Sequence, residues 1–144
     1  MKCLSLKQPY AYLLASGKKT IEIRKWNTKY RGEFLIHASK TMNDEACSVL
    51  NIERHLLVKG AIIGKGFLYD VKTYDTCEDF KRDWDKHFSI EKSNSSPSSL
   101  SSSKFKIYGF LVKDTILFSN PIPFIGKLGI FEVELWLSII LNVD

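Results

Sequence analysis

Residues 17–39 read GKKTIEIRKWNTKYRGEFLIHAS, and this stretch decides the fold. Apolar and polar residues alternate over residues 20–24, as is typical of a β-strand with one buried face. Residues 33–39 predict a second strand, with Phe34, Ile36 and Ala38 on one face and Leu35 and His37 on the opposite face. The segment between these two strands mixes cationic and aromatic side chains. Two short strands joined by such a segment are better suited to a binding site than to the centre of a hydrophobic core.

Outward from this stretch, the pattern predicts more strands than helices. Helices are predicted at residues 8–17, 43–57 and 76–88. Further strands are predicted at residues 2–6, 61–74 (with a bulge at Gly64 or Gly66), 105–112, 116–124 and 128–137. Several neighbouring strands are close enough in the chain to form antiparallel hairpins. This tally favours an α+β fold built around a small, strongly curved sheet or β-barrel.

The chain has 144 residues, which is within the usual size of one domain, so a single domain over residues 1–144 is expected. Residues 93–103 include eight serines and one proline, which predicts a flexible loop at about residues 92–104. The three cysteines form no C-x-x-C pair, so a reducing cytoplasm is the expected location. No signal peptide is expected at the start. The apolar stretch 135–143 is far shorter than the roughly 20 residues that span a bilayer, so no membrane partner is expected.

Positive charge is concentrated at the N-terminal end. Residues 1–40 contain nine lysines and arginines but only two acidic residues, whereas residues 41–144 contain twelve lysines and arginines and fourteen acidic residues. The whole chain has a formal charge of +5 and a pI near 9.1. Such segregation favours an anionic partner, nucleic acid above all, although a solubilising surface charge is the alternative.

Lys19, Glu22 and Arg24 form the first candidate site. Thr20, Glu22 and Arg24 share one face of a predicted strand, with Lys19 at its entry. Two neighbouring cations would keep the carboxylate ionised, and the carboxylate could then orient them or accept a proton. The alternative is a solvated strand face with cross-strand ion pairs of little energetic value.

The segment after this strand forms the second candidate site. Lys25 and Lys29 alternate with Trp26, Tyr30 and Arg31. This combination is typical of single-stranded nucleic-acid binding, in which bases stack on aromatic rings while cations follow the phosphates. Alternatively, Trp26 and Tyr30 could pack into the core.

The histidines and cysteines do not have metal-ligand spacing, so no metal site is predicted and no cofactor is expected. His37 lies on a predicted strand and is interpreted as a hydrogen-bonded structural histidine rather than as a metal ligand. His55 and His87 lie on predicted helices that are remote in sequence. No arrangement of Ser, His and Asp indicates nucleophilic catalysis.

Several of these motifs together resemble the ASCH domain family of the PUA-like superfamily. The resemblance rests on Leu4–Ala11 (LSLKQPYA), Gly17–Arg24 (GKKTIEIR), Tyr30-Arg31-Gly32 and Ile36–Ser39 (IHAS), with weaker matches at residues 108–111 and 126–131. It implies a PUA-like small mixed or antiparallel β-barrel with flanking helices and a cleft lined by residues 17–24. It also implies RNA binding, which the family is associated with.

Some small members that resemble this chain are enzymes. Bacterial N4-acetylcytidine amidohydrolases use a lysine, a threonine and a glutamate, and other members have been proposed to cleave single-stranded RNA. Lys19 matches the lysine, whereas Glu22 stands where the threonine would be, and no residue is matched to the glutamate. The amidohydrolase triad is therefore incomplete in this chain.

Two functions follow as hypotheses. The preferred one is an RNA-binding domain for single-stranded RNA, whose candidate contacts are Lys7, Gln8, Lys19, Arg24, Trp26, Tyr30, Arg31, His37 and Ser39. The alternative is a hydrolase acting on a modified nucleoside or on single-stranded RNA, in which Lys19 is nucleophile or base, Glu22 moves the proton and Arg24 stabilises the oxyanion. A closed pocket around Lys19 and Glu22 would favour the enzyme, and exposed Trp26 and Tyr30 beside a groove would favour binding. A third possibility is a protein-interaction domain whose charge serves only solvation.

Overall fold

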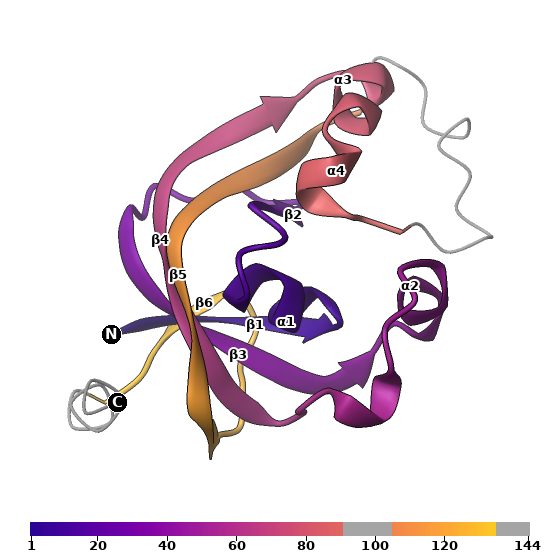
Figure 1. Cartoon of the computed structure of the whole chain (residues 1–144). Coiled ribbons are helices and arrows are strands. Elements are labelled where there is room, and N and C mark those ends of the chain that lie inside the picture. Colours follow the sequence, from indigo (N-terminus) through magenta and orange to yellow (C-terminus); the bar gives the residue numbers. More distant parts are fainter. Residues whose placement is uncertain (91–104, 135–144) are drawn as a thin grey trace.

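The computed structural model describes residues 1–90 and 105–134. Its centre is a six-stranded sheet with the order β2-β5-β4-β3-β1-β6 (Figure 1). The strands are β1 (Lys2–Gln8), β2 (Ile21–Arg24), β3 (Gly32–Met42), β4 (Ala61–Tyr74), β5 (Ile107–Pro123) and β6 (Ile130–Glu132). The pair β1–β3 is parallel, and the other four pairs are antiparallel.

The long strands β4 and β5 bend together and give the sheet its curvature (Figure 1). Their pairing register shifts at three places along β4, and bulges of this kind increase the local twist. At Gly64, β5 passes so close that a Cβ atom would lie 2.4 Å from the Ile116 carbonyl oxygen, so glycine is required there. A bulge was predicted at Gly64 or Gly66, and the register shifts next to both glycines, between Ile62 and Gly64 and between Lys65 and Phe67.

The α+β class is confirmed. Among the described strands, the hydrogen-bonded order begins at β2 and ends at β6, and these two do not pair with each other. The strands therefore form a curved, open sheet, and the closure that a barrel requires is not observed in the described ranges.

Helix α1 (Tyr10–Ala15) lies in the hollow of this sheet (Figure 1). Its buried face packs with alternate residues of β3, namely Phe34, Ile36 and Ala38, in the main hydrophobic cluster. Leu35 points to the opposite face and belongs to a second cluster with Phe131 of β6. The predicted alternation of this strand is thus confirmed, and it places His37 on the face opposite α1.

Two helices are shorter than predicted because local backbone features interrupt them. The segment 43–57 forms α2 (Asp44–Val49) and a 3-10 helix, η1 (Arg54–Leu56), separated by Asn51 with φ of 55°. Asparagine tolerates this left-handed conformation better than most residues. Val49, the last residue of α2, is 58% exposed.

The segment 76–88 forms α3 (Cys77–Arg82) and α4 (Trp84–His87). The break is at Asp83, whose side chain accepts a hydrogen bond from Tyr74 of β4. Phe80 before this break is buried, whereas Trp84 after it is 40% exposed.

The C-terminal strands also differ from the prediction. Residues 107–123 form one continuous strand, β5, which passes through Asp114 at φ of 52°. The last predicted strand is reduced to β6, and its end at residues 135–137 lies outside the described residues. The predicted serine-rich loop at residues 92–104 also lies outside them. Within the described ranges, no helix is long and apolar enough to cross a membrane.

Candidate functional site

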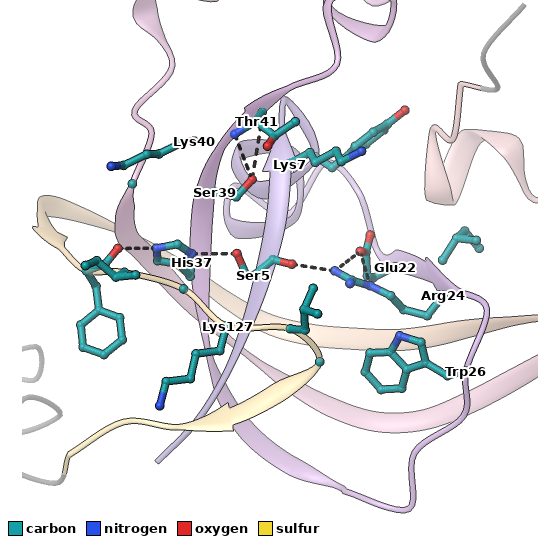
Figure 2. A pocket seen from close by; sticks show the side chains of 18 of the residues that line it. Ser5, Lys7, Glu22, Arg24, Trp26, His37, Ser39, Lys40, Thr41 and Lys127 are labelled. Atoms are coloured by element: carbon teal, nitrogen blue, oxygen red, sulfur yellow. Dashed lines mark hydrogen bonds and ion pairs between the residues drawn. The ribbon is translucent and has the colours of Figure 1, made fainter.

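A cleft of about 880 Å³ lies beside β1, β2 and β3. Its lining comes from five parts of the chain: β1 with the start of α1, β2 with the two residues after it, the end of β3, Gly60 just before β4, and the segment between β5 and β6 (Figure 2). Six of the predicted site residues line it, namely Lys7, Glu22, Arg24, Trp26, His37 and Ser39.

Glu22 and Arg24 line one wall of the cleft, and Lys19 contacts Glu22 from behind. The Arg24 guanidinium donates to Glu22 Oε2 from Nε at 3.0 Å and contacts it through Nη2 at 2.8 Å. Lys19 Nζ lies 3.2 Å from Glu22 Oε1. The Glu22 side chain is only 9% exposed. The arrangement is therefore a buried ion-pair cluster and not the solvated strand face that was the alternative.

Lys19 lies behind Glu22 and is completely enclosed. Its ammonium donates to the carbonyl oxygens of Ile21 at 2.7 Å and His87 at 2.5 Å, in addition to its contact with Glu22. An ammonium has three N–H donors, so all of them are used. Burial lowers the pKa of Lys19 from its ordinary value, and the Glu22 carboxylate opposes that change. This geometry lets Lys19 fix the position of Glu22.

Arg24 connects this cluster to the rest of the cleft. Its Nη2 donates to the Ser5 carbonyl oxygen at 2.9 Å, and the guanidinium carbon lies 5.9 Å from the centre of the Trp26 ring. Trp26 packs edge-on against Phe110 and remains 36% exposed. The indole is thus fixed on one side and accessible on the other.

His37 is held by hydrogen bonds on both ring nitrogens (Figure 2). Its Nε2 lies 2.6 Å from the Phe124 carbonyl oxygen, which can only accept, so Nε2 carries the proton. The other ring nitrogen, Nδ1, shares a hydrogen bond of 2.8 Å with the Ser5 hydroxyl. A Cβ atom on Gly126 would lie 2.6 Å from the imidazole, so this position requires glycine. These contacts agree with the interpretation of His37 as a structural histidine.

Four lysines on the cleft lining have no acidic partner within the described part of the chain. We call them the cleft lysines: Lys7, Lys25, Lys40 and Lys127. Figure 2 shows that three of them, Lys7, Lys40 and Lys127, are spread around the cleft. Glu22, the one acidic residue among the described lining residues, is already neutralised by Lys19 and Arg24. The cleft therefore carries an excess of positive charge.

Besides Lys19, three predicted contact residues do not line this cleft. Gln8 is buried, and its amide bonds the Val58 carbonyl oxygen and the Tyr12 amide. The Tyr30 hydroxyl donates to the Glu33 carbonyl oxygen, and the ring packs against the main core. Arg31 donates to the carbonyl oxygens of its own loop and lies 3.5 Å from Asp70. The structure gives these three side chains structural partners away from the cleft.

Comparison with known proteins identifies the family. The family model of the ASCH domain matches residues 4–117. The chain belongs to the ASCH domain family. The crystal structure of ASCH from Zymomonas mobilis is similar, with a TM-score of 0.67 and 16% identity over 99% of this chain and 94% of that chain. The structure of one variant of that bacterial protein has a TM-score of 0.64 and 17% identity, over 98% of this chain and 93% of that chain. The structure of a second variant has a TM-score of 0.65 and 16% identity, over 99% of this chain and 96% of that chain.

At this level of identity, the bacterial ASCH structures show the fold. No curated protein matches the sequence.

In this ASCH domain, sequence reasoning missed part of the cleft. It did not select Ser5, Lys40, Thr41 and the segment 124–129, which all line the cavity. The segment 124–129 reaches the cleft because β6 pairs with β1. Only Gly126, inside the matching stretch 126–131, was a local signal that this segment makes a close approach.

A second cavity of about 590 Å³ lies between β2, β5 and the end of α4, and Lys19 and Thr20 contribute to it. Its cations are already engaged. Lys72 Nζ lies 2.7 Å from Asp83 Oδ2, Lys86 Nζ lies 3.7 Å from Oδ1, and Lys113 lies 5.4 Å from the centre of the Tyr69 ring. Within the described residues, no group of three or more potential metal ligands is found.

Proposed function

We propose that this ASCH domain, as a single domain of residues 1–144, binds single-stranded RNA or a similar nucleic-acid strand in the cleft. The observation that carries the proposal is the surplus of unpaired positive charge: the four cleft lysines surround a cavity whose one described acidic residue is already paired. A concave basic surface attracts a polyanion and raises its local concentration. ASCH domains are associated with RNA, which agrees with this chemistry.

The half-exposed indole of Trp26 supports a strand over a simple anion. Base–aromatic stacking contributes roughly 1–3 kcal/mol per base and tolerates any base. Trp26 stands beside Arg24, whose guanidinium is also a stacking surface. The volume of about 880 Å³ is within the range of sites that hold ligands of nucleotide size.

In this proposal, some of the predicted residues contact the strand directly, whereas Lys19 acts indirectly. Lys7 meets phosphates together with the other cleft lysines, Trp26 stacks, and Ser39 offers a hydroxyl at the lining. Lys19 acts indirectly, by fixing Glu22. The alternative of a hydrolase that uses Lys19 and Glu22 remains a prediction. Enclosure of Lys19 is the criterion that favours an enzyme, but the ammonium of Lys19 has no unused proton donor. Exposure of Trp26 beside the cleft is the criterion that favours binding.

The proposal is tested by removing two cleft lysines in the variant Lys7→Ala/Lys127→Ala. Affinity for a labelled single-stranded RNA is measured by fluorescence anisotropy between 50 and 200 mM salt, which are roughly the concentrations over which phosphate contacts weaken strongly. Each lost phosphate contact should reduce the slope of log K against log salt by about 0.7, so the double variant should lose about 1.4.

The matched control is Lys81→Ala/Lys113→Ala, which removes the same charge from exposed positions outside the cleft. It should keep nearly the wild-type slope. If both double variants weaken binding equally, the charge acts globally and the cleft is not the binding site.

A further inference from the structure

The Glu22 carboxylate keeps one hydrogen-bond acceptor position unused. An ionised carboxylate has about four acceptor positions. Three of them face the neighbouring cations: on Oε2, Arg24 donates a hydrogen bond from Nε and makes an ion-pair contact through Nη2, and on Oε1, Lys19 makes an ion-pair contact. In the described part of the chain, no other donor contacts this carboxylate, although its side chain lines the cleft. The remaining position on Oε1 can therefore receive an N–H group from a ligand.

Arg24 provides the complementary group next to this acceptor. Its Nε and Nη2 are occupied, whereas its Nη1 contacts no acceptor among the described residues. Arg24 also lines the cleft and lies beside Trp26. A base that stacks near Trp26 therefore meets the Glu22 carboxylate, which can only accept, beside Arg24 Nη1, which can donate.

We propose that Glu22 and Arg24 select bases that carry an exocyclic amino group and disfavour uracil. This inference rests on the proposed function. A carboxylate accepts readily from an amino group such as cytosine N4, while a guanidinium donates to the neighbouring ring nitrogen or carbonyl. Uracil has a carbonyl oxygen in place of that amino group, and its lone pairs would face those of the carboxylate.

The burial of Glu22 makes the discrimination effective. The side chain is 9% exposed and is held from two sides by Lys19 and Arg24, so it cannot turn away from a mismatched base. Lys19 also cannot move away from Glu22, because two other N–H groups of its ammonium donate to the backbone carbonyl oxygens of Ile21 and His87. A site built from such fixed groups rejects a ligand that leaves them unpaired.

The test compares cytidine and uridine homo-oligomers of equal length, because the two bases have the same ring size. Wild-type protein should bind oligo-C about tenfold more tightly than oligo-U, within the range that one good base contact provides. In Glu22→Gln this ratio should fall close to one, because an amide can donate to uracil as well as accept from cytosine.

The matched control is Glu33→Gln, which makes the same charge change at an exposed position outside the cleft and should keep the ratio. If Glu22→Gln folds poorly, the wild-type protein is tested with oligo-N4,N4-dimethylcytidine, which has no amino hydrogens and should bind no better than oligo-U.

The outcomes separate this inference from the proposed function. Equal binding of oligo-C and oligo-U by the wild type overturns the selection of amino bases and leaves the proposed function standing. A preference for oligo-C that survives in Glu22→Gln overturns the role of Glu22. Failure of both oligomers to bind at low salt overturns the proposed function itself.

Discussion

Two cavities of this molecule are lined by cations, but their cations are in different situations. In the second cavity, Lys72 and Lys86 contact Asp83, and Lys113 lies over an aromatic ring. In the cleft, the four cleft lysines have no acidic partner among the described residues. The comparison teaches that the availability of charge, rather than its amount, distinguishes a binding surface from a structural network.

The two buried carboxylates among the described residues, Asp83 and Glu22, differ in the same way. Asp83 Oδ2 accepts from Lys72 at 2.7 Å and from the Tyr74 hydroxyl at 2.6 Å, and these bonds connect α3 and α4 to β4. They lower the pKa of Asp83 from 3.8 to about 2. Glu22 is also paired with two cations, but it lines the larger cleft beside Trp26. Asp83 should therefore matter for stability, and Glu22 for binding.

The largest expected effect is on stability, in Asp83→Ala. At pH 7 this variant should lose roughly 1–3 kcal/mol of unfolding free energy, because the buried Tyr74 hydroxyl loses its acceptor. The native pKa of Asp83, about 2, lies below its ordinary value of 3.8, so the carboxylate stabilises the fold above about pH 4.

That contribution disappears as the pH falls through 2, so wild type and variant should converge in acid denaturation curves. RNA affinity measured on the folded variant should stay unchanged. A loss of affinity comparable to that of the cleft variants would remove the distinction between the two regions.

The next effect is on binding and compares two tryptophans of similar exposure. Trp26 beside the cleft is 36% exposed, and Trp84 on α4 is 40% exposed. Trp26→Ala should weaken binding of single-stranded RNA about tenfold, because a base loses its stacking partner. Trp84→Ala should bind like the wild type in the same anisotropy titration. Equal losses in the two variants would show that the proposed stacking role of Trp26 is wrong.

The smallest expected effect concerns the segment between β5 and β6. Gly126→Ala should cost about 1 kcal/mol of stability, because its methyl group would overlap the His37 ring. Leu128→Ala, at a position 99% exposed, should change stability by less than about 0.5 kcal/mol. Thermal or urea unfolding measures both. A neutral Gly126→Ala would show that this segment is not packed against His37 as described.

Much of the fold could be predicted from local pattern. The strand predicted over residues 33–39 places Phe34 and Leu35 on opposite faces, and each is buried in a different hydrophobic cluster. The helix lengths could not be predicted, because the breaks depend on Asn51 in a left-handed conformation and on Asp83 bonding to another element. The continuity of β5 depends on its pairing with β4 along its whole length.

The candidate site was predicted in part, for a physical reason. Glu22 and Arg24 are close in sequence, so strand periodicity was enough to bring them together. Tyr30 follows in the same basic segment, but its ring packs against the main core. This orientation depends on tertiary packing and cannot be predicted from the local sequence. Lys127 is distant in sequence and reaches the cleft only through the pairing of β6 with β1.

The most direct test of the account is a titration of labelled protein with single-stranded RNA, followed by ¹H–¹⁵N NMR. The account predicts that the Trp26 indole signal and the Gly126 amide shift progressively, while the Trp84 indole and the Gly17 and Thr115 amides at the second cavity stay in place. Shifts centred on the second cavity, or no shifts at low salt, would contradict the claim that the free charge of the cleft binds the strand.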